Sequence, residues 1–166
     1  CPYGDLEWVE EDWSSACELV AYLCMNSDGV LKMNAEGASC LYAGMVTDSG
    51  RFRFNGTTGN TMRCAGYLLD YGIDTETLFA RLYLEDFDFF KVEAYAYSKM
   101  KITPNGVAYL IVDKRMQKKF NLTREQASSL VSLMGEIKGC IVWLAFIENE
   151  DGTIRTRLRS RYVTIN

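Results

Sequence analysis

Two separate stretches of the sequence carry residue types that suit phosphate chemistry. The first, YAGMVTDSGRF at residues 42–52, places Asp48 between a small apolar run and a glycine turn. The second, TIRTRLRSRYV at residues 153–163, has an arginine at every second position from Arg155 to Arg161. Carboxylates hold divalent metal ions, and the planar guanidinium group binds phosphate through paired hydrogen bonds. These stretches are therefore the candidate functional segments of the chain.

Asp48 has two interpretations that the residues alone leave open. Asp before Ser-Gly is typical of a turn, because its side chain hydrogen-bonds to the nearby backbone. Alternatively, Asp48 is one ligand of a metal centre in which divalent ions activate water. Other acidic residues do not easily complete such a centre, since those from Asp5 to Asp12 are predicted to lie along an extended, solvated segment.

Common catalytic arrangements are absent from the sequence. There is no histidine, so neither a Ser-His-Asp nor a Cys-His nucleophile can be assembled, and a mixed Cys/His zinc site is excluded. There is no P-loop and no GxGxxG motif. From its own composition, this chain supplies no catalytic residue.

The arginine-rich segment is predicted to be a β-strand with one cationic face. Side chains alternate between the two faces of a strand, so Arg155, Arg157, Arg159 and Arg161 share one face. Four guanidinium groups repel one another unless anions lie among them, which favours a phosphate contact for at least one of them. The alternative is a solvated strand face whose charge prevents edge-to-edge aggregation.

Apolar periodicity predicts a mostly helical first lobe at residues 1–100. Its first helix begins at Ser14 or Ser15, and Ser15-x-x-Glu18 fits a capping box. Further helices follow residues 59, 74 and 86. The second of these helices is predicted to bury Met62, Ala65, Gly66 and Leu69. The last is predicted to bury Phe87, Phe90, Ala94 and Tyr97.

The breaker sequence KITPNG at residues 101–106 is predicted to link this lobe to a small α/β lobe at residues 107–166. The turn sequence Glu150-Asp151-Gly152 predicts a hairpin, so the final strand runs back antiparallel. The fold class is therefore α/β. The other elements predicted here are strands at 107–112 and 141–147, a short basic helix or turn at 114–120, and an amphipathic helix after Thr123.

Composition and charge limit the kinds of partner that we expect for this chain. The net charge is −4, so the chain is not an indiscriminate nucleic-acid binder, and no apolar run approaches the roughly 20 residues that span a bilayer. The cysteines lie mostly among apolar residues, without a CxxC pair, and we therefore expect a reducing, cytoplasmic setting. The start lacks an initiator Met and a signal-peptide pattern, and we interpret the chain as a fragment.

Four segments together resemble consecutive parts of the DHH/DHHA1 phosphoesterases: PYGDLEWVEEDWSSACELV, YAGMVTDSGRFRFNGTT, NGVAYLIV and DGTIRTRLRSRYVTIN. The resemblance covers nearly the whole chain and favours the branch of small oligoribonucleases, pAp phosphatases and diadenylate phosphodiesterases. It implies that residues 1–100 are the C-terminal part of a DHH metal-binding domain. Residues 107–166 are then the N-terminal part of a DHHA1 substrate-binding domain, after a linker at 101–106.

The same resemblance implies roles for individual residues. Asp48 is the aspartate of the T-D-[ST]-G motif and would be a metal ligand in a site that holds two Mn²⁺ ions. Arg159 and Ser160 would contact the substrate, and Arg161 and Asn166 lie in the same motif. The implied substrate is a short nucleotide or oligoribonucleotide: nanoRNA, pAp, or linear or cyclic diadenylate. A homodimer is among the expected assemblies, and no membrane partner is expected.

Some family features are absent from this chain. The Asp-His-His motif would lie before Cys1, the glycine-rich GGGH segment would lie after Asn166, and Arg157 stands where serine is common. We therefore expect a metal-dependent phosphoesterase in the parent protein and an inactive isolated chain. The alternative is a non-catalytic nucleotide or nucleic-acid binding module. It would use the predicted strand that carries Arg155, Arg157, Arg159 and Arg161, here called the arginine strand. A third interpretation pairs the acidic N-terminal segment with the arginine strand of another copy.

Overall fold

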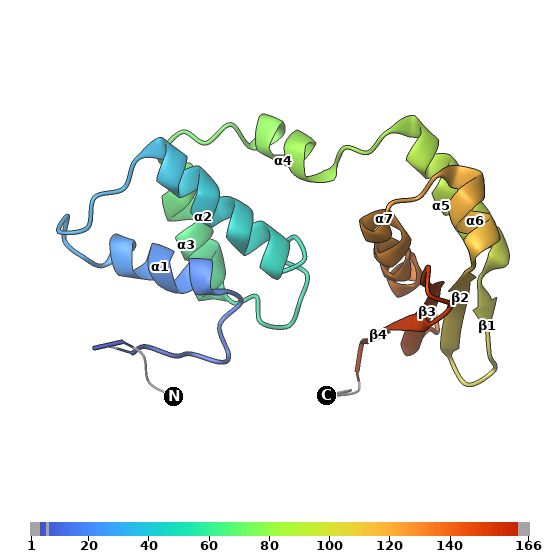
Figure 1. Ribbon diagram of the computed structural model, residues 1–166. Coiled ribbons are helices and arrows are strands. Elements are labelled where there is room, and N and C mark those ends of the chain that lie inside the picture. The colour runs from blue at the N-terminus through green and yellow to red at the C-terminus, as the bar shows by residue number, and fades with distance from the viewer. Residues whose placement is uncertain (1–3, 6, 163–166) are drawn as a thin grey trace. The chain divides into compact units, whose positions relative to one another are not determined.

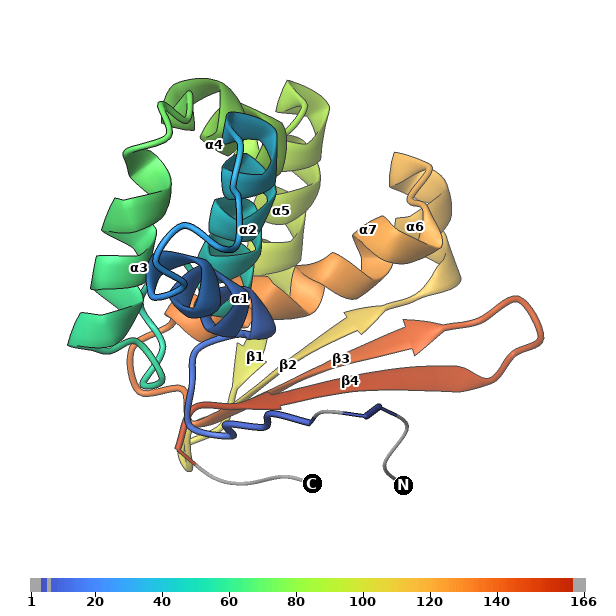
Figure 2. The ribbon, with the colours of Figure 1, turned by 90° about the vertical axis from the view of Figure 1, so that its left-hand side faces the viewer.

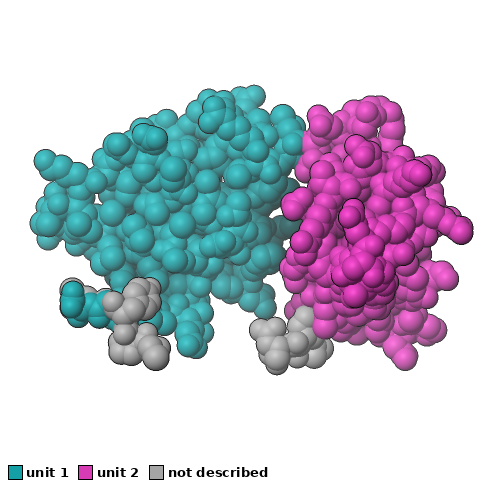
Figure 3. All heavy atoms as spheres, in the orientation of Figure 1, with its two compact units in different colours: residues 1–84 teal, residues 85–166 magenta. Residues whose placement is uncertain are grey.

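The computed structural model describes residues 4–5 and 7–162 of the 166-residue chain. The chain forms two compact units, Cys1–Leu84 and Glu85–Asn166 (Figure 3). The described residues contain seven α-helices, one 3₁₀ helix and four β-strands (Figure 1). The predicted α/β class is confirmed.

Helices make up the regular structure described in the first unit. Their bounds are α1 (Ala16–Met25), α2 (Ala35–Asp48), α3 (Gly59–Leu69) and α4 (Thr75–Tyr83). Each follows a polar residue whose side chain accepts a hydrogen bond from a free amide of the first turn: Ser15, Asn34, Thr58 and Asp74. The first three helices pack around one core, whose larger buried members are Tyr42, Met45, Val46, Cys64 and Leu68.

A buried carboxylate connects the start of α1 to the start of α3. Glu18 is 1% exposed, and its carboxylate accepts hydrogen bonds from the Ser14 amide (3.1 Å) and hydroxyl (2.6 Å). It also accepts from the Thr61 hydroxyl (3.0 Å) and the Asn60 side-chain amide (3.3 Å). Because these donors satisfy the carboxylate oxygens, the group is buried without an unmet hydrogen bond.

The predicted capping box of α1 is only half correct. Ser15 accepts a hydrogen bond from the Glu18 amide at 3.1 Å, as predicted. The reciprocal bond is not formed as predicted, because the Glu18 side chain bonds Ser14 and α3 instead. A long-range polar network has therefore taken over a side chain that local sequence assigned to the helix end.

The buried face of α3 also differs from the prediction. Met62 and Leu69, predicted to face inward, are exposed, whereas Thr61, Cys64 and Leu68 are buried. Ala65 is shared by both faces and is buried as predicted. The helix is therefore rotated by about one residue, because Thr61 is drawn toward Glu18 of α1.

The second unit is a mixed four-stranded sheet with helices on it (Figure 2). The strand order is β1-β2-β3-β4, with β2 and β3 parallel and both outer pairs antiparallel. The antiparallel hairpin predicted at the end of the chain is confirmed. The elements are α5 (Phe87–Lys99), β1 (Lys101–Ile102), β2 (Val107–Val112), α6 (Lys114–Phe120), α7 (Arg124–Ser129), the 3₁₀ helix η1 (Leu130–Glu136), β3 (Val142–Glu148) and β4 (Ile154–Ser160).

One face of this sheet forms the second core. The register pairs Leu110 with Ala145 and Val112 with Ile147, and all four side chains are buried. They belong to one cluster with buried residues of α5, α7 and η1, which are Val92, Ala96, Ala127, Leu130, Val131 and Met134. The side chains that follow one position along each strand point to the opposite face.

The segment predicted as a linker is part of this sheet. Residues 101–106 form β1 and the turn into β2, and Lys101 pairs with Tyr109. The boundary between the compact units instead lies between Leu84 and Glu85, before α5. The assignment of the two parts to DHH and DHHA1 domains stays a prediction.

Helix α5 therefore packs in the second unit, on a face that was not predicted. Val92 and Ala96 are buried there, whereas Phe87, Phe90 and Tyr97 are exposed. The aromatic stripe was the more hydrophobic face of this helix, but small side chains allow the close approach to the sheet and η1. Among the described helices, none is both long and apolar enough to cross a membrane.

Candidate functional site

Asp48 is the last residue of α2, and its side chain is exposed. The C-terminal end of a helix carries partial negative charge, so a carboxylate there is unfavourable unless a cation is nearby. The last turn of α2 contains no basic residue. Within the described part of the chain, the carboxylate accepts no hydrogen bond and forms no ion pair. Its position therefore favours binding of a cation.

The backbone after Asp48 is held in an uncommon conformation. Gly50, Arg51 and Phe52 all have positive φ angles, at 57°, 62° and 60°. This left-handed conformation costs roughly 1–2 kcal/mol for each non-glycine residue, and such strain concentrates at functional sites. These residues follow the Asp48 carboxylate almost directly.

Ser49 holds this strained turn against α2. Its hydroxyl is buried, donates to the Met45 carbonyl oxygen at 2.6 Å and accepts from the Phe52 amide at 2.8 Å. The guanidinium of Arg51 lies 3.8 Å from the centroid of the Tyr83 ring, which directs that cation to α4. Sequence reasoning did not identify Ser49, although Ser after Asp in a turn sequence was the available signal.

The surroundings of Asp48 do not complete a metal centre. Burial raises the pKa of the Cys17 thiol, and the charges of Asp48 and Cys40 raise it further, so these residues of α1 and α2 influence one another. The described residues contain no group of three or more His, Cys, Asp or Glu side chains that could hold a metal ion. The residues present therefore do not fit a complete two-metal site.

The four arginines of the second segment differ in their surroundings. Arg155 is half-buried, and its Nη2 donates to Ser128 Oγ at 2.9 Å and to the Arg124 carbonyl oxygen at 3.4 Å. Arg161 lies just beyond β4 and donates to the Gly135 carbonyl oxygen. Hydrogen bonds to α7 and η1 therefore hold Arg155 and Arg161.

Arg157 and Arg159 remain exposed. The Nη1 atom of Arg159 donates only to the carbonyl oxygen of its neighbour Leu158, at 3.1 Å. The register places Arg157 opposite Ala145 and Arg159 opposite Trp143, on the helix-bearing face of the sheet. These two guanidinium groups are the ones that remain available to an added anion.

The predicted substrate residues near the end of β4 do not share one face. Arg159 lies opposite Trp143 and Ser160 opposite Val142, so their side chains point to opposite sides of the sheet. They lie at the end of the strand, where the backbone bends at Arg161. Asn166 lies outside the described residues. Asp48 belongs to the first unit, and these residues belong to the second.

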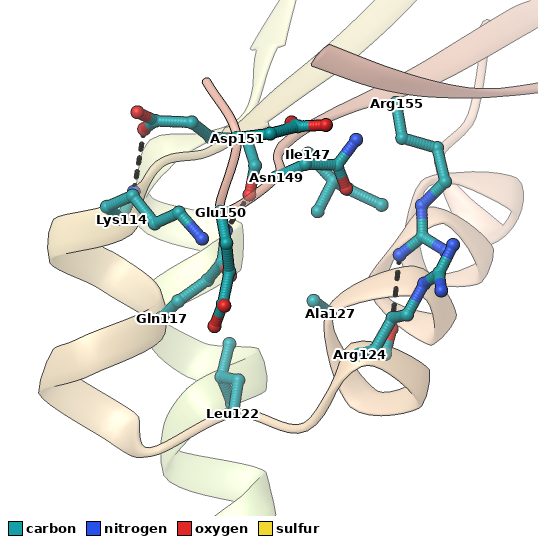
Figure 4. Close-up of a pocket in the computed structure, with 11 residues that line it drawn as sticks. Lys114, Gln117, Leu122, Arg124, Ala127, Ile147, Asn149, Glu150, Asp151 and Arg155 are labelled. Carbon is teal, nitrogen blue, oxygen red and sulfur yellow. Dashed lines mark hydrogen bonds between the residues drawn. The ribbon is translucent and has the colours of Figure 1, made fainter. Parts of the chain in front are cut away.

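A pocket of about 510 Å³ lies at the other end of the β3–β4 hairpin (Figure 4). Its lining includes three cationic and three anionic side chains, Lys114, Arg124, Arg155, Glu148, Glu150 and Asp151. Several of these groups already serve the fold: the Glu148 carboxylate accepts from the Lys114 amide, and Asp151 accepts from Thr153. The pocket has balanced charge, and its lining includes neither Asp48 nor Arg159, Ser160 or Arg161.

The surroundings of this pocket explain why the pKa of one of its arginines is lowered. Burial lowers the pKa of Arg155, and the neighbouring positive charges of Arg124 and Arg157 lower it further, while Glu125 opposes them. Arg155 thus joins β4 to α7 in a crowded cationic environment. This is a structural role that sequence alternation could not separate from phosphate binding.

Comparison with known proteins identifies relatives over the whole chain. The chain is 37% identical over 166 residues to the bifunctional oligoribonuclease and PAP phosphatase NrnA of Bacillus subtilis, covering 99% of this chain and 53% of that protein. It is also 37% identical over 164 residues to the probable bifunctional oligoribonuclease and PAP phosphatase NrnA of Streptococcus mutans, covering 99% and 52%. The chain thus spans about half the length of these relatives. No protein-family model matches.

A solved structure supports the same relationship. An exopolyphosphatase-related protein from Bacteroides fragilis superposes with a TM-score of 0.84 at 26% identity, over 95% of this chain and 46% of that chain. The sequence resemblance is confirmed: this chain is homologous, over nearly its whole length, to the oligoribonuclease and PAP phosphatase proteins of the DHH family.

Proposed function

We propose that the full-length protein is a metal-dependent phosphoesterase of short nucleotides: nanoRNA, pAp, or linear or cyclic diadenylate. The structural observation that carries this proposal is the exposed Asp48 carboxylate at the negative end of α2, followed by a strained turn. The names of the relatives support the substrate class. The isolated 166-residue chain is expected to be inactive, because Asp48 alone does not assemble a metal centre.

Residue roles follow from the same proposal. Asp48 contributes one carboxylate to a site for two Mn²⁺ ions, whose remaining ligands are not supplied by these residues. Arg159 holds a substrate phosphate, because its guanidinium is exposed and donates to the carbonyl oxygen of its own neighbour Leu158. Ser160, Arg161 and Asn166 are assigned to the same substrate end of the second unit. Manganese is the proposed metal.

The test is Mn²⁺-dependent release of AMP from the dinucleotide pApA by the full-length protein and its Asp48→Asn variant. Loss of an outer-shell partner of a metal ligand lowers activity or affinity about 10–100-fold, so loss of a direct ligand is expected to exceed about 100-fold. An unchanged thermal midpoint would show that the variant is folded. Undiminished release by folded Asp48→Asn would contradict the metal role.

A non-catalytic binding module is the second candidate, favoured by the exposure of Arg157 and Arg159. Salt dependence separates a nucleotide pocket from a broad nucleic-acid surface. Single-stranded nucleic acid loses about 0.7 log units of affinity per phosphate contact for each decade of salt. If the full-length protein releases no AMP from pApA or pAp but binds them, this candidate replaces the enzyme.

We also propose that the protein works in the cytoplasm and forms a homodimer. The five described cysteines are free thiols, which suits a reducing compartment. Pairing between the acidic N-terminal segment and the arginine strand of a second copy would be weakened by salt. Sedimentation velocity at low and moderate ionic strength tests this association, and a constant monomer at all concentrations would contradict it.

A further inference from the structure

Strand β1 forms the edge of the sheet opposite β4 (Figure 2). Basic side chains gather beside it. Residues 99–119 contain six Lys or Arg residues and a single acid, Asp113, in a chain whose net charge is −4. Four of these cations, Lys99, Lys101, Arg115 and Lys119, are exposed and come from α5, β1 and α6. Two segments of basic sequence are thus brought together only by the fold.

These four cations line one hollow of about 410 Å³, together with the tyrosine rings of Tyr95 and Tyr109. The Lys119 Nζ atom lies 4.1 Å from the centroid of the Tyr95 ring, and the Lys99 Nζ atom lies 5.4 Å from the same centroid. Two ammonium groups are therefore concentrated around a single ring. Their mutual repulsion is relieved when an anion enters the hollow.

The charge of this hollow is not neutralised by the protein. Asp113 is the acid in its lining, and its Oδ1 atom already accepts from the Met116 amide at 2.8 Å as the N-cap of α6. Across residues 4–5 and 7–162, none of the four cations forms an ion pair with a carboxylate. This differs from the pocket at the β3–β4 hairpin, where positive and negative side chains balance.

The short edge strand opens the hollow to a ligand. Strand β1 pairs only with Tyr109 and Ala108 of β2, so the outer edge of β2 beyond Tyr109 has no strand partner among the described residues. The half-buried Tyr109 lies opposite Lys101, so an aromatic ring and an ammonium group share one face. Basic groups interleaved with aromatic rings are the combination that binds single-stranded nucleic acid.

We propose that Lys99, Lys101, Arg115, Lys119, Tyr95 and Tyr109, here called the basic edge, bind the backbone and a base of a single-stranded oligoribonucleotide. This inference rests on the proposed function, because it supplies a second contact for the same substrate class. Strands β1 and β4 are separated by three inter-strand spacings, about 14 Å in all. The basic edge is therefore a contact separate from the arginines of β4, and an oligonucleotide longer than a dinucleotide is the appropriate probe.

The test is fluorescence anisotropy with a labelled riboadenylate pentamer and the 166-residue chain, in EDTA so that no hydrolysis occurs. The triple variant Lys101→Gln, Arg115→Gln, Lys119→Gln is compared with Lys32→Gln, Lys91→Gln, Lys138→Gln, which removes the same charge from exposed lysines elsewhere. Binding by the first variant is expected to weaken about tenfold, and its salt slope to fall by about two, from three contacts of about 0.7 each. The control is expected to stay within about twofold.

A separate variant tests for a nucleotide base rather than any polyanion. Tyr109→Leu keeps an apolar side chain on β2 and is expected to weaken pentamer binding about tenfold, as loss of one stacked base does, without changing binding of inorganic polyphosphate. Equal losses for the two triple variants would overturn the basic edge as a local site. Equal losses of pentamer and polyphosphate in Tyr109→Leu would overturn the RNA assignment. Because these measurements need no divalent metal or turnover, failed hydrolysis by the full-length protein would leave them interpretable.

Discussion

The Asp48 turn and the arginine strand position their charged groups in different ways. Asp48 is placed by the backbone: it ends α2, and three left-handed residues follow it while Ser49 bonds both sides of the turn. The arginines lie on or just beyond the regular strand β4. Arg155 and Arg161 form hydrogen bonds with α7 and η1, whereas Arg157 and Arg159 remain exposed. A carboxylate fixed by backbone suits a site with strict geometry. A row of arginines suits a ligand that is held mainly by charge.

This difference means that the two regions should respond to different substitutions. The Asp48 turn should be sensitive to changes that alter backbone support, even where the changed residue carries no charge. Binding by the arginine strand should tolerate substitutions that leave the backbone unchanged. The loss of binding should instead depend on which guanidinium group is removed. Three comparisons between variants examine this contrast, beyond Asp48→Asn itself.

The largest effect is expected for Ser49→Ala in the turn. Because Ser49 is buried, removal of its hydroxyl leaves the Phe52 amide without its acceptor and removes a bond to the Met45 carbonyl. We expect the free energy of unfolding to fall by about 2 kcal/mol, measured by urea denaturation. Ser132→Ala, at an exposed serine that bonds a carbonyl of its own helical segment, is the matched control. Equal stability of the two variants would show that the turn does not depend on Ser49.

The next effect distinguishes the exposed arginine from the engaged one. Arg159→Ala is expected to weaken nucleotide binding by the full-length protein about tenfold, from loss of a charge-assisted bond worth about 1.5 kcal/mol. Arg155→Ala is expected to change binding less, because that guanidinium already bonds Ser128 and the Arg124 carbonyl. Calorimetric titration with pAp measures both. Equal losses would point to a diffuse cationic face and remove the distinction between the four arginines.

The smallest effect is expected for Gly50→Ala. The φ of 57° disfavours any residue with a Cβ, and the added atom would lie 2.5 Å from the exposed ring of Phe54, which can move away. We expect a loss of about 1 kcal/mol, seen as a lower thermal midpoint. Gly66→Ala in α3 meets no atom within 4 Å and is expected to stabilise by about 0.5–1 kcal/mol. A rise in the midpoint for both variants would contradict strain in the turn.

Most helix and strand positions were predictable from local patterns, although α2 and β1 were not predicted, whereas the buried faces of α3 and α5 were not predictable. Capping residues predicted where α1, α4 and α7 begin, and the Asp-Gly turn predicted how the final hairpin pairs. In α5, hydrophobic periodicity selected Phe87, Phe90 and Tyr97, but the fold buries Val92 and Ala96. The most hydrophobic stripe is not always the buried one, because close packing also depends on side-chain size and on the partner surface.

The candidate site was predictable to a similar extent. Residue types and their motif singled out Asp48 and Arg159 without any structure. The supporting role of Ser49 was visible only in the structure, where its buried hydroxyl bonds both the Met45 carbonyl and the Phe52 amide. The basic edge joined Lys99 and Lys101 to the basic segment at 114–120, which the sequence presented as separate features. Clusters that draw on several elements are visible only when those elements have packed.

Local chemistry in the chain was enough to establish the α/β class, most element types, the hairpin and the charged groups suited to metal and phosphate, but not helix α2 or strand β1. These properties depend on residue conformation and on neighbours within a few positions. Long-range packing selected which arginines stay exposed, drew Glu18 to α3 and placed α5 in the second unit. The physical reason is that burial and hydrogen-bond satisfaction are properties of surfaces in contact, and those contacts join segments that are distant in the sequence.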